Sequence, residues 1–327
     1  MSASSPWKPF AIGSLVVLLI MGIMPLVWPL PPSSGTQDAH ALADPDSTFV
    51  TVDGLELHVK TAGSAEPAVV LLHSGAQDVF TWREVMGPLS ATHRVAAYDR
   101  TGYGLSARPT QWPGASPYGA AFQVELLVKL LDTLKLDRVV LMGHAAGATL
   151  ALAVAQKYPA RVAGLVLVAP GFSSSMEQGM GFFSRLLLGS PYGERLGPAI
   201  LERQLNVRGK DLFSQFWNEP KNLTPEILDG YRKTTQIKGW AQALYNLALS
   251  AEPLDVQSHL ADVKVPVLVV GGDKDRFVTA GDNDALAHAL PKATAVTLKD
   301  CGHVVHEECA PAFNAEAAKF LTTLGAP

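Results

Sequence analysis

Apolar residues in the body of the chain alternate between short continuous runs and longer stretches with helical spacing. A run such as AVVLLH (residues 68–73) is typical of a strand buried on both faces of a parallel sheet. A stretch such as AAFQVELLVKLLDTL (120–134) places apolar side chains along one face of a helix. We therefore predict strands at 49–52, 55–63, 68–73, 94–99, 139–143, 162–170, 265–272 and 294–298, and helices at 80–90, 120–134, 311–324 and in the alanine-rich stretch that ends at 158.

The alternation of strands and helices predicts an α/β fold. Such a chain forms a mostly parallel, doubly wound sheet with helices on both faces. The first two strands meet at Asp53-Gly54, which is a hairpin signal. Between residues 171 and 255 the strand pattern lapses, but aromatic and helix-forming residues are frequent, which favours an inserted helical lid over a disordered insert. The sheet domain is then expected at 48–170 and 256–327.

The N-terminal region has a different character from the body. No charged residue occurs between positions 9 and 37, and the centre of this stretch, FAIGSLVVLLIMGIMPLVWPL (10–30), is 21 residues long. As a helix with a rise of about 1.5 Å per residue it would be roughly 30 Å long, the thickness of a membrane's hydrocarbon core. We predict a transmembrane anchor or signal segment at residues 1–30, followed by a flexible linker at 31–47.

Two outcomes are open for this segment, retention as an anchor or cleavage as a signal peptide. Ala41-Leu42-Ala43 has the small-x-small form of a cleavage site, although the length of the apolar stretch favours a retained anchor. Lys8 precedes the segment and Asp38 is the first charge after it, which places the body outside the cytoplasm by the positive-inside rule. We expect a membrane-anchored protein with a periplasmic or extracellular body, or a secreted one if cleavage follows Ala43.

Composition excludes several classes of partner. The chain of 327 residues has a formal charge of -4 and no basic run, so nucleic acid is not an expected partner. It contains no glycine-rich phosphate loop, and we expect no cofactor. The only cysteines, Cys301 and Cys309, lie in CGHVVHEEC, whose spacing fits none of the usual zinc patterns, so no metal is expected. They form either a disulfide, which an oxidising compartment would allow, or two separate small buried residues.

Chemically useful residues follow successive predicted strands. Ligands bind at the carboxyl ends of strands in an open parallel sheet. The loops at this edge begin at His73, at Gly143 in VVLMGHAAG, at Asp273 in GGDKDRFV, and before His303 in CGHVVHEE. Small residues on a sharp strand-to-helix turn are typical of a mount for a nucleophile, and a carboxylate with an imidazole can act as a proton relay. Along the chain, the order is therefore the strand-to-helix turn after Gly143, the acidic loop at Asp273 and the loop with His303.

These motifs, together with YDRTGYGLSARP (98–109), resemble those of the α/β-hydrolase family over residues 49–324. The similarity is to the lidded branch, which includes small esterases, carbon–carbon bond hydrolases, epoxide hydrolases and haloalkane dehalogenases. The resemblance implies that Asp275, rather than Asp273, is the acid. It also implies that His303 is the catalytic histidine, with His306 as the alternative.

The resemblance also implies the oxyanion hole and exposes one departure. The backbone N–H groups of Gly75 and Ala146 would be the oxyanion donors, although Ser74 stands where the family usually has glycine. The nucleophile position is occupied by Ala145, where the esterase branch has serine and the epoxide and halide branches have aspartate. Because a methyl group can neither attack a carbonyl nor donate a proton, the expected serine nucleophile is missing.

Three explanations of Ala145 stay open at this point. The chain is an engineered inactive variant of a serine hydrolase, a natural protein that kept only a binding pocket, or a catalyst that needs only the His–Asp base, as in cofactor-free dioxygenases or lyases. We expect the first, a serine-hydrolase scaffold that is inactive or strongly impaired. Because the lid is apolar and aromatic, a small or medium apolar carboxylic ester is the expected substrate.

Overall fold

The computed structural model describes residues 22–171 and 182–325, and within them eight strands form one sheet. The spatial order is β1-β2-β4-β3-β5-β6-β7-β8, in which β1 pairs antiparallel with β2, β2 pairs antiparallel with β4, and all other neighbours are parallel. The predicted mostly parallel α/β sheet is thereby confirmed. The strands are β1 (Ser47–Val52), β2 (Leu55–Ala62), β3 (Ala68–Leu72), β4 (Val95–Tyr98), β5 (Val139–His144), β6 (Val162–Val168), β7 (Val267–Gly272) and β8 (Ala293–Leu298).

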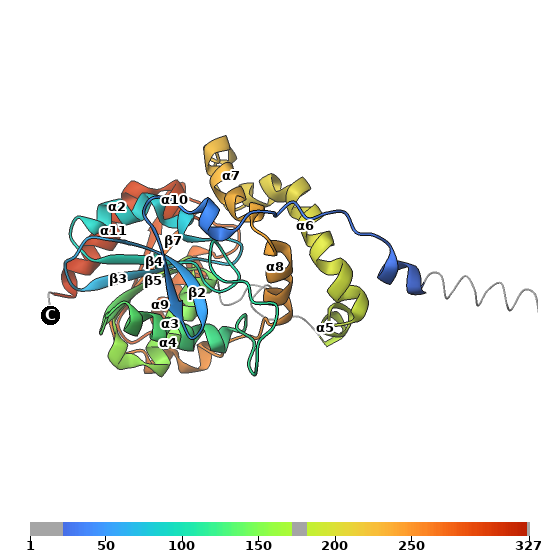
Figure 1. The fold of residues 1–327 in the computed structure, drawn as a ribbon. Coiled ribbons are helices and arrows are strands. Elements are labelled where there is room, and N and C mark those ends of the chain that lie inside the picture. The colour runs from blue at the N-terminus through green and yellow to red at the C-terminus, as the bar shows by residue number, and fades with distance from the viewer. Residues whose placement is uncertain (1–21, 172–181, 326–327) are drawn as a thin grey trace, which may run out of the picture.

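Helices cover both faces of this sheet (Figure 1). Successive side chains of a strand point to opposite faces, so β3 divides its side chains between two cores. Val70 and Leu72 pack in the cluster that includes α3 and α4, whereas Val69 and Leu71 pack with Trp82 and α11. The covering helices are α2 (Arg83–Ser90), α3 (Ala120–Thr133), α4 (Ala146–Lys157), α9 (Ala280–Ala289), α10 (Val305–Glu308) and α11 (Ala310–Thr323).

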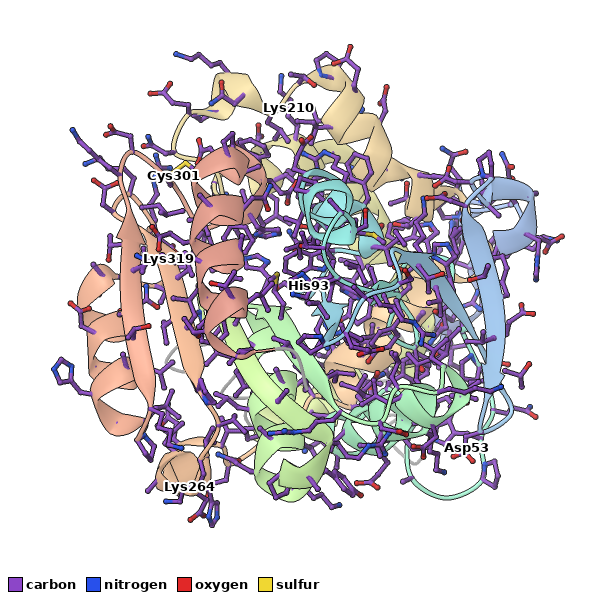
Figure 2. The ribbon with its side chains drawn as sticks, turned by 90° about the vertical axis from the view of Figure 1, so that its left-hand side faces the viewer. Asp53, His93, Lys210, Lys264, Cys301 and Lys319 are labelled. Atoms are coloured by element: carbon purple, nitrogen blue, oxygen red, sulfur yellow. A yellow bond between two sulfur atoms is a disulfide. The ribbon has the colours of Figure 1, made fainter. Side chains whose placement is uncertain are left out.

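The segment between β6 and β7 forms the expected helical lid. Its helices are α5 (Phe182–Leu188), α6 (Pro191–Ser214), α7 (Pro225–Arg232) and α8 (Trp240–Leu249). Figure 2 shows Lys264, just before β7, at the opposite end of the molecule from Cys301, just after β8, and Lys210 of α6 lies at the same end as Cys301. The lid therefore stands over the carboxyl ends of the strands.

Short 3-10 helices connect several of these elements. They are η1 (Ala39–Leu42), η2 (Val79–Trp82), η3 (Pro159–Arg161), η4 (Pro220–Asn222), η5 (Lys233–Gln236) and η6 (Gln257–Asp262). The helix predicted at 80–90 is divided in the structure into η2 and α2.

The predicted membrane segment at residues 10–30 lies largely outside the described residues. Helical structure is described at residues 22–27, where Ile23, Val27 and Trp28, at its end, are exposed. In the part of the chain that the structure describes, no helix combines the length and apolarity needed to cross a bilayer.

Part of the stretch predicted as a flexible linker, residues 31–47, lies against the lid instead. The N–H groups of Thr36 and Gln37 donate to the carbonyl of Gln236 at 2.8 and 2.9 Å, and Gln37 forms a parallel bridge with Ile237. An extended segment carries backbone groups that need hydrogen-bond partners, and η5 of the lid supplies them here. This part of the linker is therefore held in place, which corrects the expectation of a free tether.

Candidate active site

The turn between β5 and α4 holds Ala145 in a strained backbone conformation. Its φ of 45° and ψ of -111° lie in a region that residues with side chains rarely adopt. Positions 143 and 147 must be glycine because there is no room for a side chain. A Cβ on Gly143 would lie 2.3 Å from the carbonyl oxygen of Gly147, and a Cβ on Gly147 would lie 2.1 Å from the carbonyl oxygen of Leu72. This sharp strand-to-helix turn places position 145 on the wall of a large cavity.

Asp275 and His303 form a hydrogen-bonded pair in the loops after β7 and β8. His303 Nδ1 donates to Asp275 Oδ2 at 2.8 Å, and both side chains are largely buried. Asp275 Oδ1 accepts from the N–H groups of Phe277 at 2.8 Å and Val278 at 3.1 Å, so backbone bonds orient the carboxylate. Because the pair occupies Nδ1, Nε2 is the nitrogen of His303 that is left for proton transfer. His303 lines the same cavity as Ala145.

Asp273 and His306, the alternatives to Asp275 and His303, do not form such a pair. Asp273 pairs with Lys274 at 3.2 Å rather than with a histidine. His306 is fully buried, and its Nε2 lies 2.7 Å from Thr81 Oγ1. Burial, and then the nearby charge of Arg83, keep the pKa of His306 well below its usual range, so its ring is neutral. Neither Asp273 nor His306 reaches the cavity wall.

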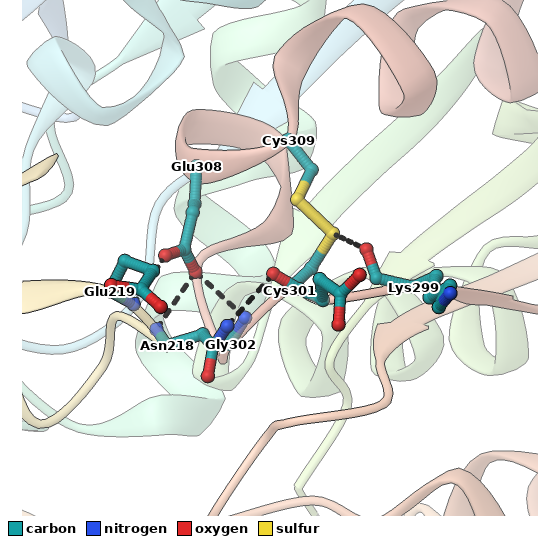
Figure 3. Close-up of a disulfide and its surroundings, with 8 residues drawn as sticks. Asn218, Glu219, Lys299, Cys301, Gly302, Glu308 and Cys309 are labelled. Carbon is teal, nitrogen blue, oxygen red and sulfur yellow. Dashed lines mark hydrogen bonds between the residues drawn. A yellow bond between two sulfur atoms is a disulfide. The ribbon is translucent and has the colours of Figure 1, made fainter.

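The two cysteines are joined in a disulfide (Figure 3). The bond closes a short loop of the chain, and His303 is one of the residues in that loop. The Cα atoms of Cys301 and Cys309 lie 6.1 Å apart, which is within bridging range. Of the two possibilities that the sequence left open, the structure shows the disulfide. Elsewhere in the described ranges, no three or more His, Cys, Asp or Glu side chains are grouped to hold a metal ion.

The carboxylate of Glu308 also holds the loop that contains His303, through hydrogen bonds (Figure 3). It accepts hydrogen bonds from the backbone N–H groups of Gly302 at 2.8 Å, Asn218 at 2.9 Å and Glu219 at 2.8 Å. Gly302 precedes His303, whereas Asn218 and Glu219 belong to the segment between α6 and α7 of the lid. One side chain thus connects the histidine loop with the lid.

The predicted oxyanion loop follows β3 and is positioned by His73. The buried imidazole of His73 accepts from the N–H of Arg100 at 3.0 Å through Nε2, and its Nδ1 donates to the carbonyl of Ser74 at 2.7 Å. Burial, with the charge of Arg100, lowers the pKa of His73 to about 3, which keeps this pattern of one donor and one acceptor at neutral pH. Gly75 and Ala146 both line the cavity beside Ala145.

This cavity, of about 730 Å³, lies between the carboxyl edge of the sheet and the lid. Its volume falls within the range typical of sites for small molecules. Apolar side chains from the sheet domain and from the lid dominate its wall, among them Leu150, Phe216, Leu244, Leu247, Phe277 and Val278. An apolar molecule with one or two polar groups suits such a space.

Sequence reasoning assigned no role to the charged residues that line the cavity in the described ranges, which are Glu252, Asp255 and, as the cation among them, Arg100. Arg100 follows β4 in the loop YDRTGYG, and its guanidinium carbon lies 4.8 Å from the centroid of the Tyr103 ring. The residue is 8% exposed. The available signal was its place just after a strand at the carboxyl edge of the sheet, which is where ligands bind.

Comparisons with known proteins agree with this geometry. A family model described as "alpha/beta hydrolase fold" matches residues 67–310. A 2-hydroxy-6-oxo-6-phenylhexa-2,4-dienoate hydrolase of Burkholderia cepacia is 29% identical over 84% of this chain and 96% of its own. A 2-hydroxy-6-oxononadienedioate/2-hydroxy-6-oxononatrienedioate hydrolase of Burkholderia vietnamiensis is 30% identical over 84% of this chain and 95% of its own.

Solved structures share the fold at lower identity. The crystal structure of a membrane phospholipase A, described as a bacterial virulence factor, superposes with a TM-score of 0.68 and 21% identity. The match covers 97% of this chain and 99% of that one.

Proposed function

Because the chain belongs to the α/β-hydrolase fold family, we propose that it is the scaffold of a serine hydrolase in which Ala145 replaces the nucleophile. Its substrate class is a small or medium apolar carboxylic ester. The observation that carries the proposal is the Asp275–His303 pair, hydrogen-bonded at 2.8 Å, on the wall of the same cavity as the strained turn at position 145. As it stands, the chain is inactive or strongly impaired toward esters.

A serine at position 145 would complete a familiar sequence of steps. Its Oγ would attack the ester carbonyl while His303 Nε2 takes the hydroxyl proton, and Asp275 would stabilise the resulting imidazolium. The backbone N–H groups of Gly75 and Ala146 would donate to the oxyanion. Ala146 is the first residue of α4, where N–H groups have no partner within the helix, which supports its assignment. His303 would then return the proton to the leaving alcohol.

The first prediction is that Ala145→Ser produces an ester hydrolase. Loss of a nucleophilic serine lowers turnover by about 10⁶-fold in a well-studied protease, so the variant should far exceed the present chain. Nitrophenyl esters from acetate to decanoate would be assayed with both proteins. His303→Ala in the Ala145→Ser background is the matched control and should return the rate to background.

Other results of the same assay would favour different functions. If Ala145→Ser stays at background with every ester and a fluorophosphonate fails to label position 145, the esterase proposal is wrong. If the present chain already transforms a substrate and loses this with His303→Ala, chemistry by the His–Asp base alone is favoured. If neither protein turns over an ester but an apolar ligand binds, a non-hydrolytic binding protein is favoured.

We also propose that residues 10–30 anchor the protein in a membrane, with the body outside the cytoplasm. The uncharged stretch is long enough to span a bilayer. Two further observations support the proposal: Val27 and Trp28, near its end, are 67% and 61% exposed, and the likeness to a membrane phospholipase A extends over 97% of the chain.

The second prediction is that the protein sediments with membranes and resists extraction by alkaline carbonate. N-terminal sequencing of the mature protein separates the two forms that the sequence allows. A start at Asp44 would mean cleavage after Ala43 and a secreted protein, and it would rule out the anchor.

A further inference from the structure

Arg100 is a buried cation that lines the cavity, and two of its hydrogen-bond donors are unsatisfied among the described residues. Only 8% of the residue is exposed, yet neither its Nε nor its Nη2 has a hydrogen-bond partner among the described residues. Buried polar groups in proteins are nearly always paired, and an unpaired charged donor is especially unfavourable. Such a residue needs a partner that the described residues do not supply.

The adjacent carboxylate, that of Asp99, is not that partner. Asp99 Oδ1 accepts from the N–H of Val79 at 2.7 Å, and its Oδ2 accepts from His58 Nδ1 and from the N–H of Leu105, each at 2.7 Å. These bonds direct Asp99 toward the sheet and the loops around it. With its carboxylate held in this way, Asp99 forms an ion pair with His58 and none with Arg100.

Neighbouring contacts hold Arg100 at the oxyanion side of the cavity. Its guanidinium stacks on Tyr103, and its own backbone N–H donates to the imidazole of His73 at the start of the predicted oxyanion loop. The hydroxyl of Tyr103 would lie 3.9 Å from a Cβ built on Gly75. Arg100 is thus part of the same wall as the predicted oxyanion donor Gly75.

We propose that Arg100 binds a carboxylate at one end of the substrate, while the ester group lies at position 145. This assignment rests on the proposed function and narrows the substrate class to apolar esters that carry one free carboxylate, such as monoesters of dicarboxylic acids. The guanidinium matches a carboxylate in shape and can donate two parallel hydrogen bonds. A single cation suits a singly charged group. The other charged residues of the wall in the described ranges, Glu252 and Asp255, are acidic and would repel a second anion.

The test measures binding to the chain as it stands, which needs no turnover. Monomethyl adipate carries one carboxylate and one ester, whereas dimethyl adipate has the same carbon chain without the charge. Calorimetry with both compounds should show tighter binding of the monoester. Arg100→Gln should weaken the binding of monomethyl adipate by about 10- to 100-fold, the range expected for hydrogen bonds to a charged group. The affinity for dimethyl adipate should not change.

Two variants control for charge and for folding. Arg203→Gln makes the same replacement at an exposed position of α6 outside the cavity wall and should leave both affinities unchanged. Arg100→Lys keeps the charge without the planar fork and should recover part of the preference. Equal weakening of both adipates in Arg100→Gln would indicate a structural role, and unchanged binding of the monoester would mean that only water occupies the site. Either result overturns the proposal.

A kinetic arm separates this proposal from the proposed hydrolase. In the Ala145→Ser background, the ratio of kcat/KM for mono-4-nitrophenyl adipate to that for 4-nitrophenyl hexanoate should fall at least tenfold with Arg100→Gln, mainly through KM. If Ala145→Ser is inactive but the calorimetric preference holds, the hydrolase proposal fails and the carboxylate site stands. If Ala145→Ser is active but shows no preference for the charged ester, the carboxylate site is wrong and the hydrolase proposal stands.

Discussion

Ala145 occupies a backbone conformation that is unfavourable whether or not the residue reacts. Backbone strain of this kind costs about 1–3 kcal/mol for a residue with a Cβ, and glycine avoids most of it. Glycine also adds conformational entropy to the unfolded chain, which offsets part of the gain. We predict that Ala145→Gly raises the free energy of unfolding by about 1 kcal/mol, measured by urea denaturation.

A second alanine of the same helix gives the comparison for this prediction. Ala153 lies inside α4, where glycine is less favourable than alanine by about 1 kcal/mol. Ala153→Gly should therefore lower stability. If Ala145→Gly also lowers it, the turn is not strained in the way that its dihedral angles indicate.

Among single residues, the sequence was informative where a motif fixed the spacing. The family pattern favoured Asp275 over Asp273 and His303 over His306, and the structure pairs Asp275 with His303. No motif in the sequence identifies Arg100 as a residue of the site. Its importance comes from burial and from missing partners, which depend on the packed structure.

At the level of elements, the loop between β8 and α11 is held by its disulfide. A cross-link around so few residues removes little entropy from the unfolded chain, and the chain-entropy relation gives about 2.5 kcal/mol for it. We predict that replacing both Cys301 and Cys309 by serine lowers the free energy of unfolding by about this much or less. In the Ala145→Ser background the same change should lower kcat, because His303 would be less firmly positioned.

Thiol counting tests the disulfide itself. Protein purified from an oxidising compartment, denatured without reductant, should contain no titratable thiol. Two thiols per chain would show that the bond does not form and would remove the reason for the expected loss of stability.

The sequence predicted the strands whose residues are all buried. It did not predict structure that depends on contacts with residues far away in the sequence. The buried strands appear at their predicted positions because continuous apolar runs identify them. Helix α9 was not predicted, since it buries only Asn283 and Leu286, although the capping box of Thr279 and Asp282 was a usable local signal. Pairing of the linker with η5 depends on residues some 200 positions away, and no local pattern encodes it.

For the whole molecule, a buried acid makes stability depend on pH. Burial, and then the charge of Asp99, raise the pKa of Asp78 to about 8. The folded state therefore binds this proton more tightly than the unfolded chain, whose aspartate titrates near 4. The resulting stability is fully present below about pH 4 and is lost as pH rises toward 8, by up to about 1.4 kcal/mol per pH unit.

We predict that Asp78→Asn reduces this loss between pH 6.5 and pH 8, measured by urea denaturation at intervals across that range. The window avoids His73, whose pKa is lowered to about 3 and whose effect on stability lies below pH 6.5. Asp137→Asn, at an exposed position, should leave the slope as it is. An equal slope in Asp78→Asn and the parent would mean that Asp78 is already ionised in the folded protein.

The bond between Cys301 and Cys309 uses every cysteine of the chain, so the oxidised protein offers no thiol to an alkylating reagent. One introduced cysteine would then be the sole site of modification. Placed by Ala145→Cys, it would carry a fluorophore or spin label to the cavity wall. Its rate of alkylation would report directly on whether a molecule occupies the cavity.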